Sequence, residues 1–163
     1  MTMRVGSGFD VHAFGPGDSV ALGGLRIPHT QGVIAHSDGD VVLHALCDAL
    51  LGAAGLGDIG QHFPDTDARW KGLDSNRFVE SVMGKLCDRG FVVVNADLTL
   101  LSQAPRIGKF REAICTNVAG LLGVAPDRVN LKATTTEQLG FIGRSEGLAA
   151  MATVLLRESA PTA

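Results

Sequence analysis

The sequence lacks the features that mark several common classes of protein. It has no apolar run of about 18 residues, so it predicts no transmembrane helix. Its 14 Lys and Arg are fewer than its 17 Asp and Glu, and the net charge is -3. Nucleic-acid-binding proteins normally carry a basic face, so this balance argues against a nucleic-acid partner. The chain enters a predicted strand at once, and we expect no signal or transit peptide and a cytoplasmic location.

Cysteine is also scarce, with only Cys47, Cys87 and Cys115. The three residues are far apart, and each lies in a stretch with a helical pattern. This spacing fits neither a zinc ribbon nor a disulfide framework. We interpret all three as free, buried thiols in a reducing compartment.

What the sequence does contain is typical of one globular domain with a real core. It has 163 residues, of which 45% are hydrophobic and 19% charged. Glycine is abundant, with 21 residues against 6 prolines, which indicates tight loops close to a ligand. No linker, repeat or low-complexity segment interrupts the chain. We therefore expect a single domain over residues 1–157 and a frayed tail at 158–163.

Hydrophobic periodicity predicts an α/β (α+β) fold. Helices are expected at 40–54, 74–89 and 106–122, and Asp74 or Ser75 can cap the second of them. Strands are expected at 3–13, 91–101, 129–135 and 146–157, with a hairpin at 19–28 and loops at 30–39 and 55–73. About three helices would then cover one face of a mixed sheet. The other face would need a partner, so we expect an oligomer.

Three residues form a candidate metal site. Asp10 and His12 are two positions apart in a predicted strand, so their side chains point to the same side. His44 lies in the predicted helix that follows. Two histidines and a carboxylate make a three-ligand set with an open position, as in catalytic zinc sites. The alternative is that both histidines are ordinary hydrogen-bonded polar residues, because spacing alone does not show that the three meet.

Asp40 and Asp48 share a helical stripe with His44, at spacings of four residues. A polar stripe on a helix that packs on a sheet requires an explanation. Either aspartate is a candidate to accept the second imidazole N–H of a ligand histidine.

The run Thr134-Thr135-Thr136-Glu137 allows two compatible interpretations. Thr134 and Glu137 match a capping box at the start of a helix. Alternatively, the hydroxyls and free amides hold phosphate while Glu137 binds a hard cation such as Mg²⁺. Arg144 is a candidate anion clamp or, equally, a solvated surface arginine.

The glycines of residues 55–60, Gly-Leu-Gly-Asp-Ile-Gly, match the spacing of a dinucleotide-binding loop. They follow a predicted helix rather than a strand, and they open no helix. The dinucleotide interpretation therefore fails its structural context.

Six blocks of sequence together resemble the 2-C-methyl-D-erythritol 2,4-cyclodiphosphate synthase family of the non-mevalonate isoprenoid pathway. They are GFDVHAF at 8–14, AHSDGDVVLHAL at 35–46, ALLGAAGLGDIGQHFPDTD at 49–67, DSNR at 74–77, SQAP at 102–105 and KATTTEQLGFIGRSEG at 132–147. The blocks span nearly the whole chain. The resemblance implies a cytoplasmic homotrimer with active sites between subunits.

The resemblance also implies roles for individual residues. Asp10, His12 and His44 would bind Zn²⁺, and Glu137 would bind a second ion, Mg²⁺ or Mn²⁺. His36 and Thr135 would be the catalytic residues, through hydrogen bonds that strengthen in the transition state. The substrate contacts it implies are Asp10, Val11, His12, His36, Ser37, Asp58, Ile59, Gly60, Phe63, Pro64, Asp65, Thr66, Asp67, Ser102, Gln103, Ala104, Pro105, Arg106, Ile107, Gly108, Thr134, Thr135, Thr136, Glu137, Phe141 and Arg144.

The implied activity is that of a phosphorus-oxygen lyase acting on a small cytidine-diphosphate substrate. In 4-diphosphocytidyl-2-C-methyl-D-erythritol 2-phosphate, the 2-phosphate would attack the β-phosphate, close a cyclic diphosphate and release CMP. Two rival functions remain from the residues themselves. One is a metal-dependent phosphohydrolase that gives an acyclic product. The other is a non-catalytic oligomer with structural zinc, which would need a fourth protein ligand.

Overall fold

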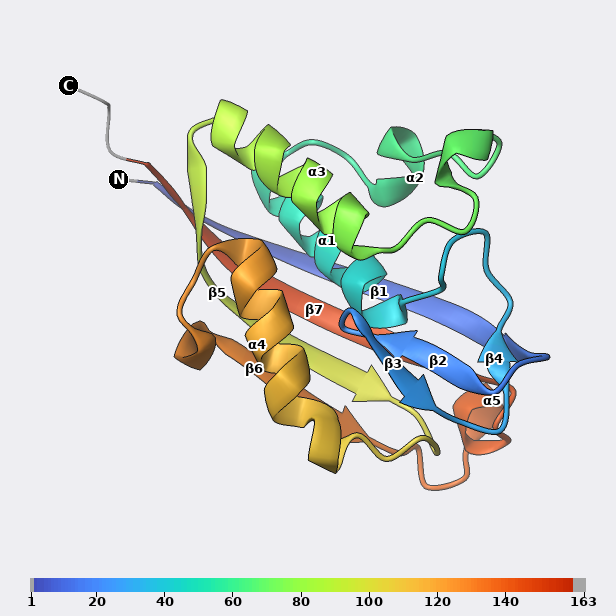
Figure 1. Cartoon of the computed structure of the whole chain (residues 1–163). Helices are drawn as coiled ribbons and strands as arrows, with labels where there is room; N and C mark the ends of the chain where they lie inside the picture. Colours follow the sequence, from blue (N-terminus) through green and yellow to red (C-terminus); the bar gives the residue numbers. More distant parts are fainter. Residues whose placement is uncertain (1, 160–163) are drawn as a thin grey trace.

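A mixed sheet of five strands is the framework of the protein, with the strands in the order β4-β1-β7-β5-β6. Figure 1 shows the computed structural model, which describes residues 2–159. The strands are β1 (Met3–Gly15), β4 (Gly32–Val33), β5 (Phe91–Leu101), β6 (Val129–Thr134) and β7 (Gly147–Glu158). Only β5 and β6 are parallel; every other neighbouring pair is antiparallel.

The predicted cover of three helices on one face is confirmed (Figure 1). The helices are α1 (Val41–Ala54), α3 (Asn76–Asp88) and α4 (Arg111–Leu122). Helix α1 lies deepest, and it buries residues on every side rather than along one stripe. Such a helix is stable only inside a core, so the position of α1 is fixed by burial.

Two glycines allow α1 to approach the sheet closely. A Cβ on Gly6 would lie 2.0 Å from the carbonyl oxygen of Ala49, and one on Gly8 would lie 1.9 Å from that of Ala45. Real Cβ atoms do not come this close to backbone, so only glycine fits at these two positions of β1. The result is direct contact between a strand and a helix that both carry candidate metal ligands.

The face of the sheet opposite the helices carries large exposed apolar side chains. Because Gly6 and Gly8 face α1, alternate residues of β1 face the other way. Phe9 is 56% exposed, and Met151, its partner in the register with β7, is 52% exposed. Met3, Val5 and Val11 extend this uncovered face along β1. Contiguous exposed apolar surface of this kind marks interaction sites.

The smaller elements refine the predicted boundaries. The hairpin consists of β2 (Ser19–Leu22) and β3 (Leu25–Pro28). The predicted loop at 30–39 contains β4, and the loop at 55–73 contains α2 (Ile59–His62) and a 3₁₀ turn (Ala68–Trp70). The predicted third helix starts late, at Arg111 after a 3₁₀ turn (Gly108–Phe110). A short α5 (Gly140–Gly143) precedes β7.

The C-terminal boundary also differs from the predicted tail. Glu158 still belongs to β7, and the N–H of Ser159 donates to the carbonyl of Gly90 over 2.7 Å. The other residues of the predicted tail, 160–163, lie outside the described residues.

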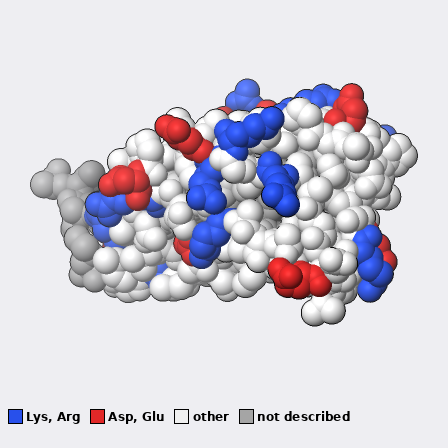
Figure 2. All heavy atoms as spheres, turned by 90° about the horizontal axis from the view of Figure 1, so that it is seen from below, with Lys and Arg blue, Asp and Glu red and all other residues white. Residues whose placement is uncertain are grey.

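Charged side chains are dispersed over the surface seen in Figure 2. Lys and Arg form a loose group near the middle of this face, separated by uncharged surface, and a few Asp and Glu lie around them. This view shows no continuous surface of either sign. Within residues 2–159, no helix has the length and apolar character needed to cross a membrane.

Candidate metal centre and adjoining pocket

The structure brings Asp10, His12 and His44 together although they come from a strand and a helix. Asp10 Oδ2 lies 3.1 Å from His12 Nε2 and 3.0 Å from His44 Nδ1. The two ring nitrogens lie 3.0 Å apart. The side chains are 26%, 15% and 11% exposed respectively, so the group is shielded but still reached by solvent. The three residues therefore form a compact triangle of possible ligand atoms.

Hydrogen bonds alone cannot satisfy all three edges of this triangle. An ionised carboxylate carries no proton, and a neutral imidazole carries one. If both ring nitrogens donated to Asp10, their two N–H groups would face each other. If only one donated, two lone pairs would face each other along another edge. A cation at the centre removes this conflict.

The dimensions of the triangle also suit a metal ion. Two ligands bound at about 2.0–2.1 Å in a tetrahedral site lie roughly 3.3 Å apart. The observed edges are 3.0 and 3.1 Å, so binding needs only small outward shifts. Burial raises the pKa of the Asp10 carboxyl, but its hydrogen bonds and charge interactions with His12 and His44 outweigh burial and lower that pKa well below its ordinary value. The Asp10 carboxyl is thus expected to be ionised at neutral pH, as a metal ligand must be.

The second nitrogen of His44 does not contact either aspartate that the helical stripe suggested. Its Nε2 lies 3.0 Å from Ser75 Oγ and 3.2 Å from Ser37 Oγ. Asp48 instead accepts the N–H of Ile59 over 2.8 Å, at the start of α2. The prediction of Asp40 or Asp48 as an imidazole acceptor is therefore wrong, because a shared stripe does not determine what lies opposite each side chain.

Asp40 has a structural role at the start of α1. Its carboxylate accepts the N–H groups of Val42 and Leu43 as the N-cap of the helix. It also accepts those of Gly23 and Gly24, at 2.9 and 2.6 Å, in the turn of the hairpin. Complete burial raises the pKa of the Asp40 carboxyl, although these four donors favour its ionised form. Asp40 thus fixes the helix end one turn before His44.

A cavity of about 160 Å³ opens beside the triangle. Its lining includes eight predicted site residues: His12, His36, Ser37, His44, Ile59, Gly60, Phe63 and Asp65. The other three lining residues are Ala35, Trp70 and Phe78, which sequence reasoning missed. Phe63, Trp70 and Phe78 stack edge to face or tilted, with ring centroids 4.8–6.1 Å apart. Trp70 is the single Trp in the chain, a signal that could have marked it.

The predicted substrate residues at 102–108 and 134–137 lie at a second place in the same chain. Val11, Ala149, Leu101 and Thr134 are in register across β1, β7, β5 and β6. Three strand spacings of about 4.8 Å put Thr134 roughly 14 Å from β1. Ser102 accompanies Thr134, because its N–H donates to the carbonyl of Thr134 over 3.0 Å. One chain therefore carries the predicted residues in two separate groups: a metal group on β1 and α1, and a loop group at 102–108 and 134–137.

The loop group does not contain the capping box that Thr134 and Glu137 suggested. No helix begins at Thr134, and Leu139 is the N-terminal residue flanking α5, without a side-chain cap. Glu137 and Gln138 instead adopt left-handed φ angles of 52° and 65°. Thr135 Oγ1 donates to Glu137 Oε1 over 3.2 Å. Left-handed backbone at two non-glycine residues is costly, and such strain clusters at functional loops.

Two predicted substrate-contact residues near this loop are exposed. Arg144 Nε donates to Glu146 Oε1 over 2.7 Å, so its guanidinium is paired within the chain. Phe141, in α5, is 40% exposed. Neither residue lines the cavity beside the metal triangle.

The glycines at 55–60 have a structural explanation, but the expectation that the segment opens no helix is wrong, because α2 begins at Ile59. Gly55 ends α1 with a left-handed φ of 69°, and Gly57 has a φ of 84°. Asp58 then caps α2 by accepting the N–H of Gln61. The segment carries the chain out of one helix and into a short second one, which forms the rim of the cavity.

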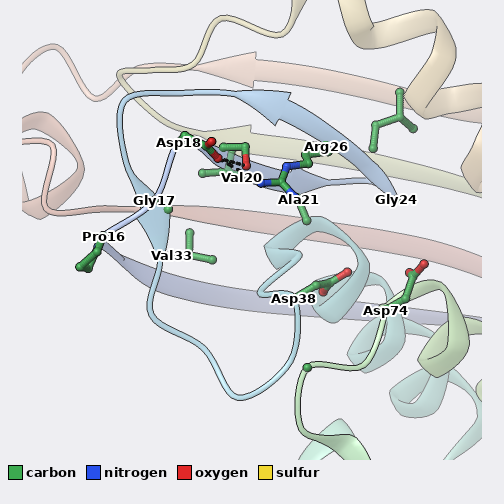
Figure 3. Close-up of a pocket in the computed structure, with 14 residues that line it drawn as sticks. Pro16, Gly17, Asp18, Val20, Ala21, Gly24, Arg26, Val33, Asp38 and Asp74 are labelled. Atoms are coloured by element: carbon green, nitrogen blue, oxygen red, sulfur yellow. Dashed lines mark hydrogen bonds and ion pairs between the residues drawn. The ribbon is translucent and has the colours of Figure 1, made fainter.

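A larger hollow of about 510 Å³ lies between the hairpin, β4 and the start of α3 (Figure 3). None of the predicted site residues lines it. Asp38 and Asp74 stand on one wall, and Asp18 is paired with Arg26 on the other at 3.0 Å. Its carboxylates are all engaged within the chain.

Comparisons with known proteins show the family of the chain. A family model described as the YgbB family matches residues 3–157. The 2-C-methyl-D-erythritol 2,4-cyclodiphosphate synthase of Xanthomonas axonopodis pv. citri is 58% identical over 159 residues, 97% of this chain and 96% of that protein.

Solved structures are similar along nearly the whole chain. A 2C-methyl-D-erythritol-2,4-cyclodiphosphate synthase has a TM-score of 0.87 and 42% identity, over 94% of this chain and 100% of that one. The bifunctional IspDF of Campylobacter jejuni has a TM-score of 0.93 and 45% identity over 96% of this chain. This match covers only 42% of the longer IspDF chain. The chain therefore belongs to the YgbB family, whose members among these relatives are named 2-C-methyl-D-erythritol 2,4-cyclodiphosphate synthases.

Proposed function

We propose that the protein is a metal-dependent phosphorus-oxygen lyase of isoprenoid precursor synthesis. It converts 4-diphosphocytidyl-2-C-methyl-D-erythritol 2-phosphate to 2-C-methyl-D-erythritol 2,4-cyclodiphosphate and CMP. The single observation that carries the proposal is the triangle of Asp10, His12 and His44 at the mouth of a cavity. The membership of the chain in the YgbB family supports the choice of substrate. Two solved relatives, one from Plasmodium falciparum, are described as CDP-bound.

The division of site residues into two groups supports a homotrimer with shared active sites. A single chain holds the metal group and the loop group roughly 14 Å apart, measured across the strands of one sheet. A neighbouring copy would bring its loop group to the metal group of the first. The uncovered apolar face of β1 and β7 gives copies a surface on which to associate.

The donor sets fit two cations of different kinds. Asp10, His12 and His44 would hold Zn²⁺, and Glu137 would hold Mg²⁺ or Mn²⁺. When bound, the ions supply Lewis-acid stabilisation of charge on the transferring phosphoryl group. Among residues 2–159, the ligand set of the triangle includes only three protein residues, which argues against a closed structural zinc site.

The residues of the chain supply position and hydrogen bonds. The attacking phosphate oxygen is already anionic, so no strong general base is required, and no nucleophilic side chain is assigned. His36 and Ser37 line the cavity and can donate to phosphate. Thr135 can do so from the partner's loop group, and His36 with Thr135 stabilises the transition state. The cavity is lined on its apolar side by Phe63, Trp70 and Phe78. These rings limit access of water to the reacting groups.

The experiment that tests the function is phosphorus NMR of the product. The purified protein is incubated with the substrate, Zn²⁺ and Mg²⁺. A cyclic diphosphate with one equivalent of CMP supports the lyase. A linear phosphate product would instead identify the rival phosphohydrolase, in which the same ligands activate water.

Mixing two impaired variants tests the shared active site. His44→Ala removes the metal group and Glu137→Gln the loop group. If each active site uses both groups from different copies, refolding the two variants together restores some intact sites. At a Mg²⁺ concentration too low to support turnover by Glu137→Gln, activity is expected in the mixture and not in either variant alone. A mixture that stays inactive while forming mixed trimers contradicts shared sites.

A further inference from the structure

Ser75 is completely buried at the start of α3, next to the metal triangle. A serine at the N-terminus of a helix usually accepts a backbone N–H of the first turn. Ser75 makes no such capping bond. Asp74 takes that role, because its Oδ1 accepts the N–H of Asn76 over 2.8 Å. The Ser75 hydroxyl is therefore free to point inward, where it lies 3.0 Å from His44 Nε2.

Asp38 determines where the single hydroxyl proton of Ser75 goes. The Ser75 hydroxyl donates to Asp38 Oδ1. Asp38 also accepts the N–H of Ser75 over 3.0 Å and that of Asp40 over 3.1 Å. A carboxylate that receives these donors has no proton to give. Because its proton is committed to Asp38, Ser75 can only accept at its contact with His44.

The proton of His44 must then be on Nε2. A neutral imidazole carries its proton on one nitrogen, and the other nitrogen has the lone pair that binds a metal. With Nε2–H donating to Ser75, Nδ1 presents its lone pair to Asp10 Oδ2 and His12 Nε2. That is the nitrogen that lies in the triangle. Ser37 Oγ also lies 3.2 Å from Nε2, but it contacts no carboxylate that would fix its proton.

We propose that Ser75, held by Asp38, is a positioning residue of the metal site: it fixes His44 in the tautomer and orientation that bind the metal through Nδ1. This inference rests on the proposed metal-dependent function. Partners of this kind typically change metal affinity by about 10–100-fold when they are removed. Asp38 also lies on the wall of the larger hollow (Figure 3), so the chain of contacts runs from that hollow to the metal ligand.

The test measures zinc affinity by competition with a chromophoric chelator. Ser75→Ala is expected to weaken zinc binding about 10–100-fold while the far-ultraviolet circular dichroism stays unchanged. Ser75→Thr keeps the hydroxyl and should restore most of the affinity. Ser81→Ala is the control, because Ser81 lies on the same helix α3 but is exposed. It should bind zinc like the wild type.

A Ser75→Ala variant that folds and binds zinc as tightly as the wild type overturns the proposal. If that variant fails to fold, long-range proton–nitrogen NMR on the zinc-free wild type decides the matter. A proton on Nε2 of His44 supports the positioning role of Ser75, and a proton on Nδ1 overturns it. A wild type that binds no zinc refutes the metal site itself and this inference with it. These results separate failure of the positioning role from failure of the proposed function.

Discussion

Asp10 Oδ2 and His44 Nδ1 lie 3.0 Å apart, although 34 positions separate the two residues in the sequence. One comes from a sheet strand and the other from the helix packed on it. Their distance is set by the glycines of β1, which let α1 rest directly on the strand. The geometry of the candidate metal site thus depends on the packing of the core.

His44→Ala should lose zinc and nearly all turnover while keeping the fold. The substitution removes one of the three candidate ligands, and α1, which carries His44, is held in place by many other buried residues. We expect turnover to fall by about 100-fold or more. Zinc content after dialysis and circular dichroism check this. His62→Ala is the control, since His62 contacts the carbonyl of Leu56 and should leave zinc bound. Full turnover without zinc would disprove the assignment.

Glu137→Gln should weaken the response to Mg²⁺ or Mn²⁺ without altering zinc content. The change keeps the size of the side chain and removes the negative charge that a hard cation requires. We expect the metal concentration for half-maximal turnover to rise by roughly tenfold or more. Turnover against added metal measures this. Glu112→Gln, an exposed substitution in the first turn of α4, is the matched control. An unchanged curve for Glu137→Gln contradicts its role.

Gly8→Ala should destabilise the fold and weaken zinc binding together. The added Cβ would lie 1.9 Å from the carbonyl oxygen of Ala45, the residue after His44, so α1 must move away from β1. Overpacking of this kind costs about 1–3 kcal/mol or more. Urea unfolding and zinc titration measure both effects.

Gly52→Ala is the control for Gly8→Ala, because Gly52 lies on α1, the helix that packs on Gly8. A Cβ at Gly52 meets nothing within 4 Å, and alanine is the better helix former by about 0.5–1 kcal/mol. It should raise stability and leave zinc affinity unchanged. If Gly8→Ala behaves the same way, close packing of α1 on β1 does not position the site.

The three cysteines should differ in reactivity toward iodoacetamide. Cys87 is exposed, Cys47 is buried, and Cys115 is intermediate, so the prediction of three buried thiols is wrong for Cys87. Burial raises the pKa of the Cys47 thiol far above its ordinary value, with smaller effects from Asp48 and Asp40. Alkylation requires the thiolate, so at pH 8 Cys87 should react first and Cys47 only after unfolding. Mass spectrometry of timed samples locates the label, and early labelling of Cys47 would contradict its burial.

Periodicity in the sequence predicts the helices and strands well, but it does not predict which side chains contact each other. The strand pattern placed Asp10 and His12 on one side, and the helical pattern placed His44 on α1, because both depend only on local geometry. The imidazole partner was missed, because Ser75 is 31 positions from His44 and looked like a helix cap. The capping box at Thr134 and Glu137 is a false prediction, because the spacing of the two residues does not reveal that Glu137 and Gln138 adopt left-handed backbone.

The four N–H groups that converge on Asp40 couple two local structures. A two-stranded hairpin is only marginally stable by itself in water. The turn of this hairpin and the first turn of α1 share one carboxylate, so neither can open without breaking contacts of the other. Their amide protons should therefore exchange with solvent deuterium as one cooperative unit, and the hairpin should unfold together with the helix end that precedes His44.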